Sequence, residues 1–98
     1  MTDEPIPTEL LEARVEIDRI DRELIALLAE RFALTHQVGK VKAARSLNAV
    51  DPAREARKLE EIRALCEQYQ LNPQLGTALF TQIMEDVVKN HQLLAEQE

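Results

Sequence analysis

The sequence is poor in several residue types, and each shortage excludes a class of protein. It has three aromatic residues and no tryptophan, which argues against a platform for stacking nucleic-acid bases. Acidic side chains outnumber basic ones and the net charge is −6, which argues against nucleic acid or an anionic membrane as a partner. No apolar run approaches the length of a membrane span, and the acidic start MTDEPIPTEL does not resemble a signal peptide.

Cysteine and histidine are equally scarce. A single cysteine, Cys66, cannot form a disulfide within the chain and suits a reducing compartment, so we predict a cytoplasmic protein. One cysteine and two histidines, spread over three predicted helices, do not make a metal-ligand cluster, and His36 is expected on the surface. No serine or cysteine stands in an arrangement typical of nucleophilic catalysis. We therefore expect no metal site and no catalytic nucleophile.

The residues that are abundant favour helices. Leucine, alanine, glutamate, arginine and glutamine dominate, only two glycines occur, and 98 residues suffice for one domain. Pro5 and Pro7 disfavour regular structure near the start of the chain. We predict an all-α fold, with a flexible lead-in over residues 1–7 and a single helical domain over residues 8–98.

The first predicted helix runs from about residue 8, with Thr8 as its N-cap, to about residue 45. Apolar residues recur along it on a heptad seam, at Leu10, Ile17, Leu24 and Val38 and at Ala13, Ile20, Leu27, Leu34 and Val41. Such a helix is roughly 55 Å long, whereas a compact chain of this size has a radius of gyration of about 13 Å. A second copy of the chain is the simplest cover for this seam, and a kink at Gly39 is the alternative.

Two further helices follow a loop over residues 46–50. The dipeptides Asp51-Pro52 and Asn72-Pro73 are each typical of a helix start, with an N-cap residue before a proline at the first helical position. We predict helices from these points to about residues 70 and 95, and hence three helices per chain. Their apolar stripes contain Leu59, Ile62, Cys66 and Tyr69 in the second helix and Phe80, Met84, Val87, His91 and Leu94 in the third.

One charged residue interrupts the heptad seam. Arg31 occupies a seam position, and a buried guanidinium needs an anion, which is either an acid of this chain, such as Asp86 or Glu55, or a ligand. Lys42 follows eleven residues later, within about 20° on the same helix face. The two cations suit a small anion between them, although a solvated basic face with one buried ion pair is the alternative. Arg14 is too far along the helix to join them unless an antiparallel partner provides it.

Four segments carry a family resemblance: LLEARVEIDRIDRELIALLAER, VGKVK, DPAREARKLEEI and LFTQIMEDVV. In this order and at this spacing they resemble the small all-helical chorismate mutases over about residues 10–94. The resemblance implies an intertwined homodimer of three-helix chains with two equivalent sites. It also implies conversion of chorismate to prephenate, in phenylalanine and tyrosine biosynthesis, by a [3,3] rearrangement without a cofactor.

The resemblance assigns three cations to the dianionic substrate. Arg31 matches the family's arginine that binds one carboxylate, and Arg14 matches the arginine that the other protomer donates to the second carboxylate. Lys42 matches the lysine that bonds the ether oxygen and a carboxylate. Because the breaking C–O bond places negative charge on the ether oxygen, a cation fixed beside it stabilises the transition state more than the ground state.

The resemblance also assigns residues around the substrate hydroxyl and the ether. Asp51 and Glu55 match the pair around the hydroxyl, and Arg54 matches a nearby arginine. Val87 stands where many members have a serine near a carboxylate. His91 stands where many have glutamine or an acid as second donor to the ether oxygen. Since imidazole can also donate a hydrogen bond, we predict that His91 fills this role and that activity depends on pH.

Other interpretations of the same pattern stay open. Isochorismate pyruvate lyase resembles this chain in fold and in most of the pocket, and a mutase for an amino-substituted chorismate would differ at the hydroxyl end. A non-catalytic helical dimerisation module would explain the seam, but it would not explain Arg14, Arg31 and Lys42 together. The sequence identifies no partner enzyme.

Overall fold

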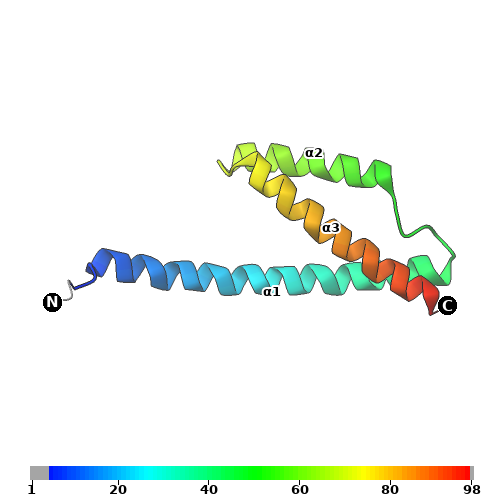
Figure 1. The fold of residues 1–98 in the computed structure, drawn as a ribbon, viewed down its shortest axis with the longest axis horizontal. Helices are drawn as coiled ribbons and strands as arrows, with labels where there is room; N and C mark the ends of the chain where they lie inside the picture. The colour runs from blue at the N-terminus through cyan, green and yellow to red at the C-terminus, as the bar shows by residue number, and fades with distance from the viewer. Residues whose placement is uncertain (1–4, 98) are drawn as a thin grey trace. The chain divides into compact units, whose positions relative to one another are not determined.

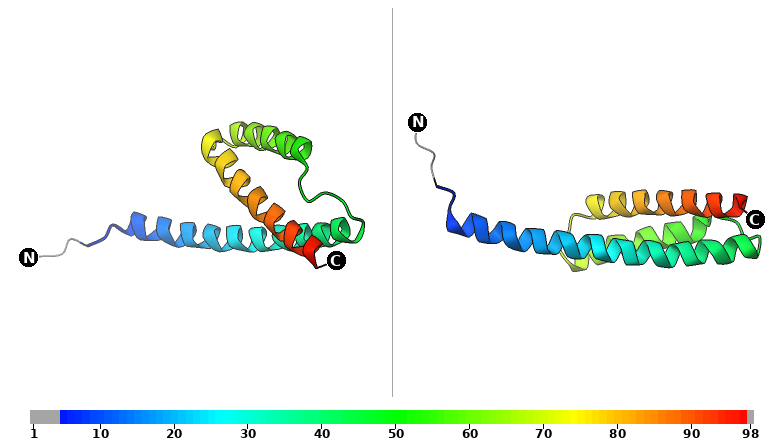
Figure 2. Two further views of the ribbon diagram at one scale, coloured as in Figure 1. Left: turned by 45° about the vertical axis from the view of Figure 1, so that its right-hand side comes forward. Right: turned by 90° about the horizontal axis from the view of Figure 1, so that it is seen from below.

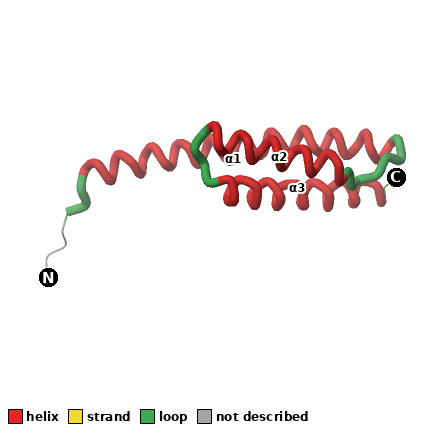
Figure 3. Tube along the Cα trace, turned by 90° about the horizontal axis from the view of Figure 1, so that it is seen from above, coloured by secondary structure: helices red, strands yellow, loops and turns green. Residues whose placement is uncertain are grey.

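Three α-helices make up the chain in a computed structural model that describes residues 5–97 (Figure 1). Helix α1 spans Thr8–Ala44, α2 spans Pro52–Gln68 and α3 spans Pro73–Glu96, and residues 5–97 contain no strand (Figure 3). The prediction of an all-α chain with three helices is confirmed, and each boundary lies within about two residues of the expected one. Of the predicted lead-in, residues 1–4 lie outside the described residues, and residues 5–7 precede α1.

The chain divides into two units at residue 33, inside α1. The described part of the first unit, residues 5–33, consists of the N-terminal part of α1 and the three residues before it. The second unit contains residues 34–44 of α1 together with α2 and α3 (Figure 2). Helix α1 continues through Gly39 without interruption. Within residues 5–97, no helix is apolar over enough of its length to cross a membrane.

The apolar side chains of the first unit are largely exposed. The large apolar seam residues of this unit expose between 42% and 62% of their surface, namely Leu10, Ile17, Ile20, Leu24 and Leu27. A leucine or isoleucine side chain contributes about 1.5–3 kcal/mol to stability only when it is covered. The described part of the first unit therefore has no apolar core of its own.

Side-chain caps begin α2 and α3, as predicted. The Asp51 and Asn72 side chains each accept a hydrogen bond from a backbone amide of the helix that follows, at 3.2 Å and 3.0 Å. At the start of α1, the Pro7 carbonyl accepts the first amides of the helix instead. Thr8 is thus the first helical residue, and its prediction as N-cap was wrong by one position.

Two helices end in a left-handed residue that is not glycine. Ser46, after α1, has a φ of 55°, and Gln70, after α2, has a φ of 58°. In both places the next amide donates at 2.8 Å to a carbonyl in the last helical turn, Leu47 to Lys42 and Leu71 to Cys66. This is the Schellman arrangement, which normally uses glycine. A non-glycine residue loses about 1–2 kcal/mol in this backbone conformation, so both turns hold a residue that is locally unfavourable.

The core of the second unit lies between α2 and α3. Ile62 and Cys66 of α2 and Ile83 of α3 expose only 8%, 5% and 6% of their surface. The two helices approach closely at Gly76, where an added Cβ atom would collide with the Cys66 sulfur. Burial of Cys66 confirms its predicted place in the apolar stripe. Tyr69, which was expected in the same stripe, is 73% exposed because α2 ends before it.

We expect Gln70→Gly to stabilise the fold. Glycine adopts the left-handed conformation without the cost that glutamine carries there, so the free energy of unfolding in urea should rise by about 0.5–1 kcal/mol at fixed protein concentration. The matched control is Gln82→Gly, an exposed position in the middle of α3, where the free energy should fall by about 1 kcal/mol. Effects of the same sign and size would contradict a left-handed residue 70.

Candidate functional site

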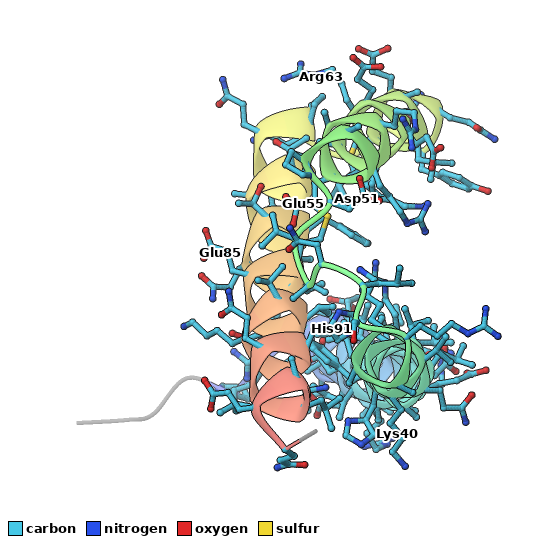
Figure 4. The ribbon with its side chains drawn as sticks, turned by 90° about the vertical axis from the view of Figure 1, so that its right-hand side faces the viewer. Lys40, Asp51, Glu55, Arg63, Glu85 and His91 are labelled. Atoms are coloured by element: carbon cyan, nitrogen blue, oxygen red, sulfur yellow. The ribbon has the colours of Figure 1, made fainter. Side chains whose placement is uncertain are left out.

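The last turns of α3 pack against the end of α1 at a residue without a side chain. At Gly39 an added Cβ would lie 2.5 Å from Cδ2 of His91 and 2.7 Å from Cδ1 of Leu94, closer than real Cβ atoms approach other atoms. Gly39 is buried, and Figure 4 shows His91 on the side of α3 that faces α1. The glycine is therefore required for close approach of the two helices.

His91 is the buried polar residue of this crossing, with 4% of its surface exposed. Its Nε2 lies 2.7 Å from the backbone carbonyl oxygen of Thr35. A carbonyl only accepts, so Nε2 carries the hydrogen and donates it. Nδ1 exposes less than 1 Å² and has no hydrogen-bond partner in the described part of the chain. Val87, the other predicted site residue of α3, lies one turn earlier and is half-buried.

A second histidine lies beside the first. His36 is half-buried, and its Nδ1 is 3.1 Å from Nδ2 of Asn90, the residue before His91. The amide NH₂ group donates, so His36 accepts through an unprotonated Nδ1. The expectation of a surface position for His36 was wrong, because the His36 ring is bonded to Asn90 where α3 crosses α1.

Lys42 is held by the loop between α1 and α2. It is half-buried, and its Nζ donates to the carbonyl oxygen of Ala49 at 3.5 Å. Its own carbonyl accepts the amide of Leu47 at 2.8 Å. The loop therefore restrains both the backbone and the ammonium of Lys42. Because an ammonium has three hydrogens and this bond is long, donors are left for a ligand.

The start of α2 brings three predicted site residues together. Asp51 caps the helix through Oδ1, which accepts the amide of Arg54, and its carbonyl accepts the amide of Glu55 at 3.0 Å. Glu55 is half-buried, whereas Asp51 and Arg54 are exposed. Figure 4 shows Asp51 and Glu55 close together at this end of α2. The cap leaves Oδ2 of Asp51 for another partner.

The other cations near the middle of the sequence do not join this group. Lys40 lies on the opposite side of α1 from His91 (Figure 4). Lys58 bonds the carboxylate of Glu61 at 3.0 Å, one turn further along α2. That hydrogen bond, and the charge of Lys58, lower the pKa of the exposed Glu61 carboxyl. Of the cations from residue 38 to 45, Lys42 is thus the one that the loop holds in a half-buried position.

Arg14 and Arg31, the remaining predicted site residues, lie in the first unit. Arg14 is exposed and Arg31 is half-buried. Seventeen residues of α1 separate them, which is about 25 Å along the helix axis. One chain therefore does not bring these two guanidinium groups together.

Sequence reasoning missed the groups that hold the crossing. The Thr35 carbonyl belongs to the backbone, so the residue type does not indicate its hydrogen bond to His91. Asn90 is one of several polar residues of α3, and nothing in the sequence distinguishes it from the others. The one available signal was Gly39, since glycine inside a helix costs about 1 kcal/mol relative to alanine. A glycine kept at such a position indicates close approach of another element.

Comparison with known proteins identifies the family of this chain. Residues 13–92 match the family model described as chorismate mutase type II. The chain belongs to the type II chorismate mutase family. The resemblance seen in the four sequence segments is thereby confirmed.

Three relatives of this chorismate mutase family member differ in length. The chain is 32% identical over 77 residues to a chorismate mutase of Methanocaldococcus jannaschii, and the match covers 79% of this chain and 78% of that protein. It is 39% identical over 88 residues to the bifunctional chorismate mutase/prephenate dehydratase of Escherichia coli K12, covering 90% of this chain and 23% of that enzyme. It is 37% identical over 81 residues to the T-protein of Haemophilus influenzae, covering 83% of this chain and 22% of that protein. It thus spans most of the first relative and less than a quarter of the other two.

Substitution can separate the cap of Asp51 from its proposed contact with substrate. Asparagine caps a helix about as well as aspartate, so Asp51→Asn should change the free energy of unfolding by less than about 0.5 kcal/mol, whereas Asp51→Ala should lower it by about 1 kcal/mol. Loss of mutase activity in the stable asparagine variant would assign the carboxylate to the substrate. Urea unfolding and activity are measured on the same samples, and equal stability of both variants would contradict the cap.

Proposed function

We propose that this chain is a chorismate mutase, which converts chorismate to prephenate by a [3,3] rearrangement in phenylalanine and tyrosine biosynthesis. The proposal is carried by the family match over residues 13–92, together with 32% identity to a chorismate mutase along most of both chains. Because the chain spans only 23% of the bifunctional relative, no dehydratase activity is proposed. Cys66 is a buried free thiol, which suits the reducing cytoplasm that we propose as the location.

Cations fixed before the substrate arrives supply the catalysis in this proposal. Arg31 and Lys42 bind the dianion and hold its enolpyruvyl arm folded over the ring, in the conformation that reacts. Lys42 also donates to the ether oxygen, where negative charge grows as the C–O bond breaks. Restraint by the loop, through the Ala49 carbonyl at 3.5 Å, supports a preset position for this ammonium.

The ends of the substrate are assigned to α2 and α3. Asp51 and Glu55 contact the hydroxyl, with Arg54 beside them, which agrees with their grouping at the start of α2. Val87 cannot make the hydrogen bond that a serine would donate to a carboxylate. We expect substrate binding to be modestly weaker for this reason. His91 acts as second donor to the ether oxygen, through Nδ1, because Nε2 is already bonded to Thr35.

We further propose a homodimer in which each site takes Arg14 from the partner copy. The exposed seam of residues 8–33 supports this arrangement, since it offers a long apolar face for a second helix. The spacing of Arg14 and Arg31 supports it as well. The two carboxylates of one small substrate cannot reach guanidinium groups about 25 Å apart on one helix, whereas an antiparallel partner brings its own Arg14 near.

Products identified after incubation with chorismate test the proposed reaction. We expect prephenate, and we expect Arg31→Ala to lower kcat/KM by at least about a hundredfold, because a charge that stabilises the transition state is removed. The matched control is Arg63→Ala, an exposed arginine on the outer side of α2 (Figure 4), which should keep the activity. Isochorismate is supplied in parallel. Salicylate and pyruvate from isochorismate, with little prephenate from chorismate, would contradict the proposal in favour of a lyase.

A further inference from the structure

The two ring nitrogens of His91 have different surroundings before any ligand binds. Nε2 donates to the Thr35 carbonyl at 2.7 Å. The same edge of the ring lies against Gly39, where an added Cβ would lie 2.5 Å from Cδ2 and 3.1 Å from Nε2. The carbonyl fixes the hydrogen on Nε2, and the missing side chain at residue 39 gives the ring room to reach that carbonyl.

This fixed hydrogen determines what Nδ1 can do. In the neutral ring Nδ1 has only a lone pair, so it accepts hydrogen bonds and cannot donate one. The carboxylates and the ether oxygen of a dianionic substrate are also acceptors. A lone pair facing an acceptor is repulsive, so Nδ1 can bond these groups only when the ring is an imidazolium. A buried polar atom without a partner costs about 1–3 kcal/mol, which favours a ligand that supplies one.

We infer that His91 binds the dianion as an imidazolium, with Thr35 and Gly39 as positioning residues that fix its tautomer, so that ligand binding takes up one proton at each site. The inference rests on the proposed function, and it states that the complex of the protein with its substrate holds one additional proton. Nδ1 exposes less than 1 Å², so an acceptor that reaches it makes a charge-assisted bond out of water, which is stronger than one in solvent. The side chains that cover Nδ1 must move aside to admit it.

Titratable residues flank the crossing on the two helices that form it. Within one helical turn of Gly39 or His91 these are His36, Lys40 and Lys42 on α1 and Lys89 on α3, and Lys40 lies on the opposite side of α1 from His91 (Figure 4). None of them bonds Nδ1 within the described residues: His36 is bonded to Asn90, and the Lys42 ammonium to Ala49. A bound dianion favours the imidazolium, because its two negative charges attract both the ring and Lys42.

The coupling has a definite sign. The complex holds one proton more than the free protein, so affinity for the dianion falls as pH rises where the free ring is neutral, by up to about tenfold per pH unit. At lower pH, where the free ring already carries the proton, affinity stops changing. Glutamine at residue 91 donates its amide hydrogen at any pH, so His91→Gln should remove the slope.

Calorimetry with a stable bicyclic ether dicarboxylate, shaped like the rearranging substrate, measures the proton directly. Titrations at pH 7.5 in phosphate and in Tris, which differ in ionisation enthalpy, give the number of protons taken up. We expect about 0.5–1 per site for the unchanged protein and none for His91→Gln. The matched control His36→Gln should keep the uptake, since His36 is bonded to Asn90 instead of the ligand.

Each result of these titrations has a separate meaning. Binding without proton uptake, or uptake that persists in His91→Gln, would overturn the inference and leave the proposed function intact. Absence of binding by the unchanged protein would overturn the proposed function itself.

Nitrogen-15 spectra of the histidine rings test the positioning residues apart from activity. In the free protein His91 should carry hydrogen on Nε2 alone, and in the complex on both nitrogens. Gly39→Ala should push the ring from the Thr35 carbonyl and give a mixture of tautomers, an effect that general loss of stability would not produce. A free protein with hydrogen on Nδ1 and not on Nε2, or an unchanged tautomer in Gly39→Ala, would overturn the inference.

Discussion

Apolar surface along α1 is the feature on which the rest of the molecule depends. The helix has 37 of the 98 residues, and the large apolar residues of its seam in the first unit are exposed. Among the described residues the buried hydrophobic ones are Ile62, Cys66 and Ile83, all in α2 and α3. Covering the five exposed seam residues of the first unit would supply on the order of 10 kcal/mol, which is comparable to the whole stability of a small domain.

In the proposed dimer, the same helix accounts for a site that is made from two copies. A substrate with two carboxylates requires two well-placed cations, and Arg14 and Arg31 are too far apart on α1 to serve one molecule. An interface that covers the seam would bring these arginines together from different chains. Stability and catalysis would then depend on one surface, so a substitution in the seam would weaken both.

Local features of the fold were predictable and distant ones were not. The starts of α2 and α3 could be read from Asp51-Pro52 and Asn72-Pro73, because each cap bonds an amide only two or three residues away. The left-handed Gln70 could not be read, since glutamine has no preference for that conformation. The bond from His91 to Thr35 joins residues 56 apart, and no periodicity along one helix reports such a contact.

For the candidate site, too, the sequence indicated some residues but not the contacts between helices. Arg31 and His91 stood out because each breaks an apolar stripe, and the family match agrees with the resemblance that gave them roles. What the sequence could not give is the state of the His91 ring. It depends on a backbone carbonyl and on the space above Gly39, both of which come from packing between helices.

A complementation assay tests most directly whether each site is built from two chains. Arg14→Ala and Arg31→Ala should each be nearly inactive as separate proteins, whereas a dimer with one chain of each kind has one intact site. After equal mixing and subunit exchange, half of the dimers are mixed, so activity should recover to about a quarter of that of the unchanged protein. Activity that stays at the level of the separate variants, although mass spectrometry of an isotope-labelled chain shows that exchange occurred, would contradict a shared site.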